Sequence, residues 1–227
     1  MTECPLCLGG ESSLFCSSKV TRERIDDYWR CPSCDLVFRD PLKLPDQKFE
    51  KEHYGKHENT ASNEGYRNFL HQIVAPVTSE LESGARGLDF GCGPGTDRVL
   101  ASLFQDAGFE MSTWDPIFDN DPAKLGYTYD FVISTEVIEH FHRPEKSWQD
   151  MLALVRPGGV LGVQTSFSDE YLEPGRFKEW WYPRDPTHVS FYSKKTFKWM
   201  SAWRNLELVC AKNPVAVFRT SSRGESG

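Results

Sequence analysis

Three glycines alternate with other residues at the end of a short apolar run, in the stretch LDFGCGPGT. Gly91, Gly93 and Gly95 carry no side chains, so a ligand can approach the main chain closely there. Asp115 ends the next apolar run, and a carboxylate at that place can accept hydrogen bonds from both hydroxyls of a ribose. The alternatives are a tight strand-to-helix turn and an Asx turn of Asp115 with the following proline. Together the loop and the carboxylate predict a nucleoside-type ligand.

Four of the seven cysteines form two C-x-x-C pairs that are separated by 23 residues, namely Cys4, Cys7, Cys31 and Cys34. Two such pairs are typical of a tetrahedral zinc site with four thiolate ligands. The alternatives are two disulfides or four unrelated thiols, and a reducing compartment disfavours disulfides. We predict zinc at this site. Because a segment of about 40 residues has little core, the metal would supply much of its folding free energy.

A third group of reactive side chains lies in the stretch WWYPRDPTHVSFYS. His188 is a candidate general base for an alcohol or phenol acceptor, and Asp185 is a candidate to orient its imidazole ring. The aromatic residues around them suit an apolar acceptor pocket or a lid; they are Phe177, Trp180, Trp181, Tyr182, Phe191 and Tyr192. The alternative is a structural histidine in a strand and aromatic side chains in the core.

Strands and helices alternate through the part of the chain that must position these groups. Strands are expected at 85–90, 109–114, 129–135, 160–166, 206–211 and 214–220, and helices at 96–108, 144–155 and 193–203. This alternation predicts an α/β fold with a Rossmann-like, mostly parallel sheet, helices on both faces and an antiparallel strand at the C-terminal end. Ligands of such sheets bind outside the carboxyl ends of the strands, which is where the glycines and Asp115 are expected.

We divide the chain into four segments. Residues 1–41 are expected to form a small N-terminal zinc ribbon, and 42–83 a helical linker and cofactor lid. Residues 84–220 form the sheet domain, and 221–227 a disordered tail. Within the linker, apolar residues at helical spacing predict an amphipathic helix that Pro76 kinks and Gly84 ends.

Charge and composition bound the class of partner. The net charge is −7 and the isoelectric point about 5.4, which disfavours a protein that binds nucleic acid mainly through its phosphates. The N-terminus shows no basic and apolar leader, and no apolar run reaches the roughly 18 residues that a membrane-spanning helix needs. We therefore expect no membrane partner and a cytoplasmic location.

The stretches LDFGCGPG, WDP, YDFVISTEVIEHF and LVRPGGVLGV occur in this order, and over residues 64–220 the sequence resembles the class I S-adenosylmethionine-dependent methyltransferases. The resemblance implies that Asp89 orients the methionine ammonium of the cofactor, Asp115 holds its ribose, and residues 134–136 lie near its sulfonium. The implied cofactor-binding residues are Asp89, Gly91, Cys92, Gly93, Pro94, Gly95, Asp115, Pro116, Ser134, Thr135 and Glu136. A Glu-His pair is frequent after this last segment, which makes His140 a second catalytic candidate, with a cofactor-shell or helix-packing role as the alternative.

The sequence departs from the family between Asp115 and Asp130. The 14 intervening residues are too few for the helix, third strand and loop that the family has there. We predict a sheet shortened after the second strand and carry over no adenine-binding carboxylate, for which Asp119 or Asp121 is a weak substitute.

Two residues before the sheet are candidates to cover the cofactor. Tyr66 and Arg67 are placed to cap it, with Arg67 pairing to its carboxylate. The alternative for Arg67 is a solvated helix face.

These features favour an enzyme that methylates a hydroxyl or amine of a small molecule, such as a saccharide or secondary metabolite. Two alternatives stay open: an RNA methyltransferase that presents its substrate with the zinc ribbon, and a non-catalytic zinc-ribbon binding module.

Overall fold

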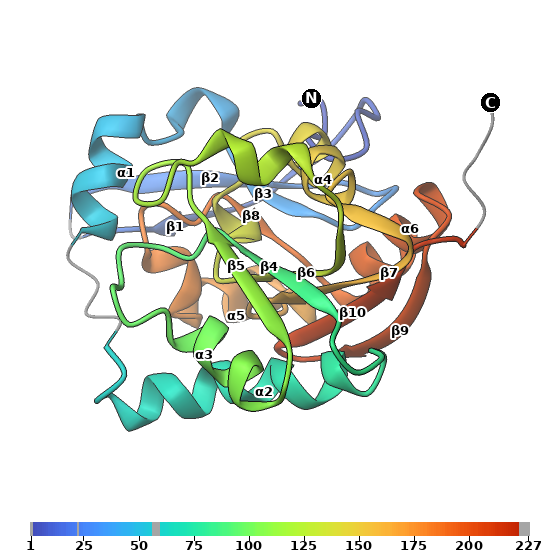
Figure 1. Ribbon diagram of the computed structural model, residues 1–227. Coiled ribbons are helices and arrows are strands. Elements are labelled where there is room, and N and C mark those ends of the chain that lie inside the picture. The colour runs from blue at the N-terminus through green and yellow to red at the C-terminus, as the bar shows by residue number, and fades with distance from the viewer. Residues whose placement is uncertain (1, 22, 56–59, 223–227) are drawn as a thin grey trace.

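The computed structural model describes residues 2–21, 23–55 and 60–222, which form two β-sheets (Figure 1). The larger sheet has the order β5-β4-β6-β7-β10-β9. Its strands are β4 (Arg86–Phe90), β5 (Glu110–Trp114), β6 (Tyr129–Thr135), β7 (Val155–Gln164), β9 (Glu207–Lys212) and β10 (Val215–Arg219). β5, β4, β6 and β7 are parallel, and β10 runs antiparallel between β7 and β9. The predicted fold class is confirmed. Most of the tail predicted to be disordered, from residue 223 on, lies outside the described residues.

Helices cover both faces of this sheet. Successive side chains of a strand point to opposite faces. In β6, Phe131 packs in the cluster on one face and Val132 in the cluster on the other, and each face is covered by a pair of helices. The first pair is α2 (Glu64–Thr78) and α3 (Val99–Asp106), and the second is α4 (Pro144–Leu152) and α6 (Lys194–Trp203). None of the helices in the described part of the chain is long and apolar enough to cross a membrane.

β5 is an edge strand of the sheet, as the short segment after it predicts. Between β5 and β6 the chain forms only a short 3-10 helix, Pro122–Gly126. The third strand of the family and its preceding helix are therefore missing here, which leaves the carboxyl ends of β4 and β5 less covered.

Two boundaries differ from the prediction. α2 ends at Thr78 rather than at Gly84, because the hydroxyls of Thr78 and Ser79 donate to carbonyls of the last turn, at 3.4 and 3.1 Å. β7 begins at Val155 rather than at residue 160, and its register against β6 shifts between Tyr129 and Phe131. Both changes are local, and neither moves an element to another place in the sheet.

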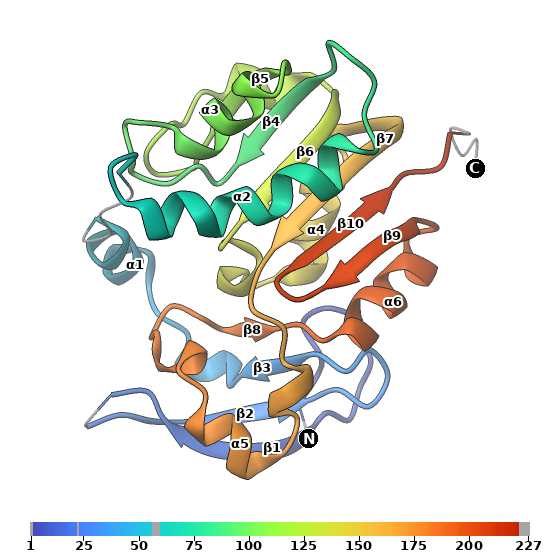
Figure 2. The ribbon, with the colours of Figure 1, turned by 90° about the horizontal axis from the view of Figure 1, so that it is seen from below.

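The smaller sheet combines three strands of the N-terminal segment with one strand from the second half of the chain. Its order is β1-β2-β3-β8, with β1 (Ser13–Lys19), β2 (Ile25–Arg30), β3 (Val37–Arg39) and β8 (Ser190–Phe191). β8 lies between β7 and α6 in the sequence, yet it pairs antiparallel with β3 from the N-terminal segment (Figure 2). α5 (Pro174–Glu179) contacts β1 on the same side of the molecule. The strand pairing therefore crosses the predicted division at residue 41.

Arg39 joins the two parts of the smaller sheet. Its side chain is fully buried, and its Nε lies 3.3 Å from the buried carboxylate of Asp26. Its guanidinium donates to the carbonyl oxygens of Pro183, at 3.4 Å, Asp185, at 3.1 Å, and Pro186. A residue of β3 thus holds the loop that precedes His188.

We expect Arg39→Ala to lower the free energy of unfolding by about 3 kcal/mol, because it removes the donor from three backbone carbonyls and one of the two arginines that pair with the buried Asp26, the other being Arg24. Chemical denaturation measures the loss. Lys43→Ala is the matched control, since the pair of Lys43 with Asp27, at 3.2 Å, is largely exposed and is worth less than about 1 kcal/mol. Equal losses in the two variants would contradict the role given to Arg39.

Candidate active site and cysteine cluster

A cleft of about 1180 Å³ lies outside the carboxyl ends of β4, β5 and β6. The glycine loop and Asp115 line one end of it, and His140, His188 and Trp181 line the other. Trp181 is 62% exposed, which places a large apolar side chain at the solvent boundary of the cleft. The position agrees with the rule for ligand sites in open parallel sheets.

The glycine loop requires glycine for two separate reasons. Gly91 and Gly93 have φ angles of +83° and +68°, a region that side chains disfavour. A Cβ atom at Gly91 would also lie 2.5 Å from a methyl group of Val137. The amide of Gly91 donates to the carbonyl of Trp114 at 2.7 Å, which ties the loop to the end of β5.

Asp115 anchors the loop. One oxygen of its buried carboxylate accepts from the amide of Gly93 at 3.0 Å. The other accepts from the amides of Ile117, at 2.8 Å, and Phe118, at 2.9 Å. The Asx-turn alternative is therefore present in the structure. It does not exclude ribose binding, because a carboxylate has about four acceptor sites.

Asp89 and Arg98 give this end of the cleft its charge. Asp89 is buried, one of its oxygens has no hydrogen-bond partner within the described ranges, and burial raises its pKa to about 7. Arg98, which the sequence did not single out, donates to the carbonyl of Gly93 at 3.0 Å and to the sulfur of Cys92 at 3.1 Å. Arg98 lies three residues after Gly95 and has a backbone φ of +45°. Its side chain reaches back to the glycine loop.

Most of the predicted cofactor residues line the cleft: Asp89, Gly91, Cys92, Gly93, Pro94, Gly95, Asp115, Pro116, Thr135 and Glu136. Ser134 does not. Alternation along β6 points its side chain to the opposite face from Thr135, where it is fully buried. A contact of Ser134 with the cofactor stays a prediction, since its side chain does not line the cleft.

Of the other residues proposed to contact the cofactor, some line the cleft and some do not. Tyr66 lines the cleft, whereas Arg67 is exposed on α2, which favours the solvated-face alternative. Asp119 accepts from Thr113 at 2.6 Å and pairs with Lys124 at 3.0 Å. Asp121 is exposed. Neither aspartate lines the cleft, so neither replaces the adenine-binding carboxylate.

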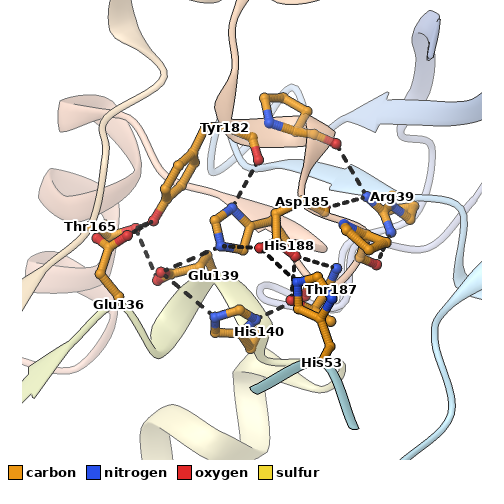
Figure 3. Close-up of polar contacts among 12 residues, drawn as sticks. Arg39, His53, Glu136, Glu139, His140, Thr165, Tyr182, Asp185, Thr187 and His188 are labelled. Carbon is orange, nitrogen blue, oxygen red and sulfur yellow. Dashed lines mark hydrogen bonds and ion pairs between the residues drawn. The ribbon is translucent and has the colours of Figure 1, made fainter. Parts of the chain in front are cut away.

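Two histidines meet at the other end of the cleft, with their ring centres 4.8 Å apart (Figure 3). The Nδ1 of His188 lies 2.9 Å from the carbonyl of Tyr182, and the Nδ1 of His140 lies 3.0 Å from the carbonyl of Thr187. A carbonyl oxygen only accepts, so both Nδ1 atoms carry the proton. In the neutral rings each Nε2 then presents a lone pair. Burial lowers the pKa of His188, which keeps its ring neutral.

The carbonyl of Tyr182 holds the Nδ1 side of the His188 ring. Asp185 lies 3.9 Å from the Nε2 of His188, which is beyond hydrogen-bond distance. Its carboxylate instead accepts from the amide of Thr187 at 2.8 Å and lies 3.2 Å from the Nε2 of His53. The orienting role of Asp185 stays a prediction, with the carboxylate close to His188 but not hydrogen-bonded to it.

Glu139 lies beneath the two histidines and was not singled out in the sequence. It is fully buried, and one oxygen accepts from the hydroxyl of Thr165 at 3.1 Å. The other lies 3.9 Å from the Nε2 of His140 and 4.0 Å from that of His188. Burial raises the pKa of Glu139 and of the neighbouring Glu136, and the charge of Glu139 adds to the shift at Glu136.

The tertiary fold brings these side chains together by docking the 187–192 segment on the 3-10 helix Ile138–His140. The amide of Val189 donates to the carbonyl of Glu139 at 2.8 Å. The hydroxyl of Tyr192 donates to the carbonyl of Ile138 at 3.1 Å. Sequence reasoning named both histidines but gave no sign that they are neighbours.

The four predicted cysteine ligands converge. The Sγ atoms of Cys4 and Cys34 lie 3.5 Å apart, those of Cys7 and Cys31 lie 3.4 Å apart, and all four lie within 4.8 Å of one another. A tetrahedral zinc ion with bonds of about 2.3 Å to sulfur sets its ligands about 3.8 Å apart, so the cluster fits the metal. All four are free cysteines, so the disulfide alternative is not what the structure has.

A family model described as "Methyltransferase domain" matches residues 61–211, more than half of the chain. The chain belongs to this methyltransferase family. No curated protein sequence matches it. Together with the fold, the family makes this a class I S-adenosylmethionine-dependent methyltransferase.

Solved structures share the fold at low sequence identity. A 1,6-didemethyltoxoflavin-N1-methyltransferase from Burkholderia thailandensis, with bound 1,6-didemethyltoxoflavin and S-adenosylhomocysteine, is similar with a TM-score of 0.53 and 12% identity. The match covers 91% of this chain and 99% of that one. The magnesium protoporphyrin IX methyltransferase of Synechocystis, with bound S-adenosylhomocysteine, is similar with a TM-score of 0.43 and 15% identity, over 77% of this chain and 94% of that one.

We expect Asp115→Ala to weaken S-adenosylhomocysteine binding by about tenfold or more, because the variant loses an acceptor for the ribose and the anchor of the Gly93 amide. Titration calorimetry measures the affinity, and circular dichroism checks that the variant is folded. Asp121→Ala, which removes an exposed carboxylate from the same loop, should bind as the unmodified protein does. Unchanged affinity in a folded Asp115→Ala protein would contradict the site.

Proposed function

We propose that this methyltransferase methylates a hydroxyl or amine of a small molecule that binds at the histidine end of the cleft. The observation that carries the proposal is the single cleft that runs from the glycine loop to His140 and His188. Its volume of about 1180 Å³ exceeds the roughly 300–1,000 Å³ usual for one small ligand, so it has room for a cofactor and an acceptor together. The Burkholderia structure also holds two such molecules at once.

The cofactor supplies a methyl group on a positively charged sulfur. Of the chain's own residues, Asp89 is suited to the cofactor's ammonium, since its buried carboxylate has an unused oxygen. Asp115 and the glycine loop are suited to the ribose. At the other end the two histidines face the acceptor, and the lone pair of a neutral Nε2 activates its hydroxyl. The aromatic rings of Tyr54 and Trp181 line the same end and exclude water from it.

The charge of the cleft favours a small acceptor over RNA. Carboxylate side chains outnumber lysine and arginine side chains along it, six to three, and the chain as a whole carries a net charge of −7. A phosphate backbone would be repelled from such a surface.

The proposal is tested with methyl-labelled S-adenosylmethionine and two fractions of a cell extract, one of small molecules and one of RNA. We expect label in the small-molecule fraction. His188→Ala should transfer label about 10²–10⁴ times more slowly, because it loses the group that activates the acceptor, while S-adenosylhomocysteine binds with an affinity within about twofold.

His71→Ala is the control, since this histidine is exposed on α2. Label in the RNA fraction alone would support the RNA alternative. A folded protein that does not bind S-adenosylhomocysteine would support the non-catalytic module. Equal losses of transfer and cofactor affinity in His188→Ala would make that residue structural.

We also propose that the cysteine cluster holds a structural zinc ion. Cys4, Cys31 and Cys34 are buried in the same core cluster as residues of α4 and α6, and the partly buried Cys7 packs against it. The metal would therefore stabilise the surface against which the larger sheet packs.

Cys31→Ser should lose this zinc and unfold at a lower temperature, as measured by metal analysis of protein purified under reducing conditions and by thermal denaturation. Cys210→Ser, outside the cluster, should keep its zinc. A Cys31→Ser protein with unchanged zinc content and melting temperature would refute the site.

A further inference from the structure

Three atoms that can ligate a metal converge at the base of the cleft, namely one carboxylate oxygen of Glu139 and the Nε2 atoms of His140 and His188. Both histidines donate their Nδ1–H to backbone carbonyls, so in the neutral rings both Nε2 atoms present a lone pair toward Glu139. The facing oxygen of Glu139 has no hydrogen-bond partner in the described part of the chain, although the residue is fully buried. A buried arrangement of acceptors without a donor is costly unless a cation occupies its centre.

We propose that Glu139, His140 and His188 bind a divalent metal ion. One carboxylate and two imidazoles are a donor set used by catalytic zinc and other first-row transition ions. The three ligand atoms lie within 4.8 Å of one another. The oxygen-to-nitrogen distances of 3.9 and 4.0 Å are too long for hydrogen bonds. They exceed by about half an ångström the ~3.4 Å that tetrahedral bonds of about 2.1 Å would give.

The surroundings of the three ligands are those of a metal site. Metal-bound histidines usually donate their other ring N–H to a backbone carbonyl or carboxylate, as both do here to Tyr182 and Thr187. Glu139 is held through its second oxygen by Thr165. The ion-pair partners of Glu139 among the described residues are the two histidines alone, so no lysine or arginine neutralises it.

The site would face the acceptor. His140 and His188 line the cleft, whereas Glu139 lies below it, so the free coordination positions of the ion would point into the cleft. This inference rests on the proposed function and refines the role of His188, whose Nε2 would bind the metal rather than a proton. The ion would bind the oxygen of the acceptor hydroxyl and lower its pKa.

Methyl transfer to that oxygen requires an acceptor for the hydroxyl proton and a leaving group for the methyl carbon. The hydroxyl proton passes to Glu136, which lines the cleft and has one oxygen without a hydrogen-bond partner in the described segments. The acceptor oxygen forms a bond to the methyl carbon. The bond between carbon and sulfur breaks, and its electron pair stays with sulfur.

Cobalt(II) is the probe, because it reports its ligands by absorption. Full-length protein with zinc in the cysteine cluster is treated with a chelator and titrated with Co²⁺. We expect one further Co²⁺ per chain, with visible d–d bands and without the intense ultraviolet charge-transfer band of cobalt bound to thiolates. His188→Ala and Glu139→Gln should each weaken this binding by about tenfold or more.

Glu139→Gln keeps the shape of the side chain, so it serves if His188→Ala fails to fold. His142→Ala is the matched control: this histidine lines the same cleft but pairs with Glu50, at 2.9 Å, and should leave Co²⁺ binding unchanged. No such binding, or binding that Glu139→Gln and His188→Ala leave intact, would overturn the metal site. If label transfer then still depends on His188, the proposed function stands without the metal. Co²⁺ binding in a protein that does not bind S-adenosylhomocysteine would refute the function instead.

Discussion

The buried guanidinium of Arg39 is the constraint on which the acceptor end of this methyltransferase depends. It is paired with Asp26 within the N-terminal sheet and donates to three backbone carbonyls of the loop that leads to His188. A buried ion pair contributes little net stability by itself, but it is costly to break from one side. Arg39 therefore specifies where the loop lies. The short pairing of β3 with β8 continues the same contact.

This arrangement gives the N-terminal segment a part in the site. The cysteine cluster, β3 and Arg39 support one wall of the acceptor pocket through β8 and the 183–188 loop. A ribbon that only presented a substrate from outside would have no reason to share a sheet with this loop. The proposed zinc and the proposed acceptor site are thus coupled through the backbone, although the ribbon's cysteines do not line the cleft.

The cleft itself joins two different kinds of chemistry. Its cofactor end is built from main chain and carboxylates at the ends of parallel strands, which is where an α/β sheet concentrates unpaired backbone amides. Its other end, where we propose that the acceptor binds, is built around Glu139, His140 and His188, whose polar atoms lie close together. The loss of the third strand leaves β5 at the edge, so the adenine side of the cleft is bordered by Phe118 and Leu125 instead of a further strand.

The sequence by itself determined the features that depend on local pattern: the alternation of strands and helices, the missing strand after Asp115, the glycine loop, and the pairing of the cysteines by spacing. Each follows from periodicity or from a conformation that only glycine adopts easily, and both are written in neighbouring residues. Tertiary structure alone decided the rest. Ser134 and Thr135 differ in which face of β6 their side chains point to, and the carbonyl of Tyr182 bonds the Nδ1 of His188 while Asp185 lies near its Nε2. The meeting of Glu139, His140 and His188, and the shared sheet of β3 and β8, join residues far apart in the chain. Such contacts depend on how whole elements dock, and no local pattern encodes that.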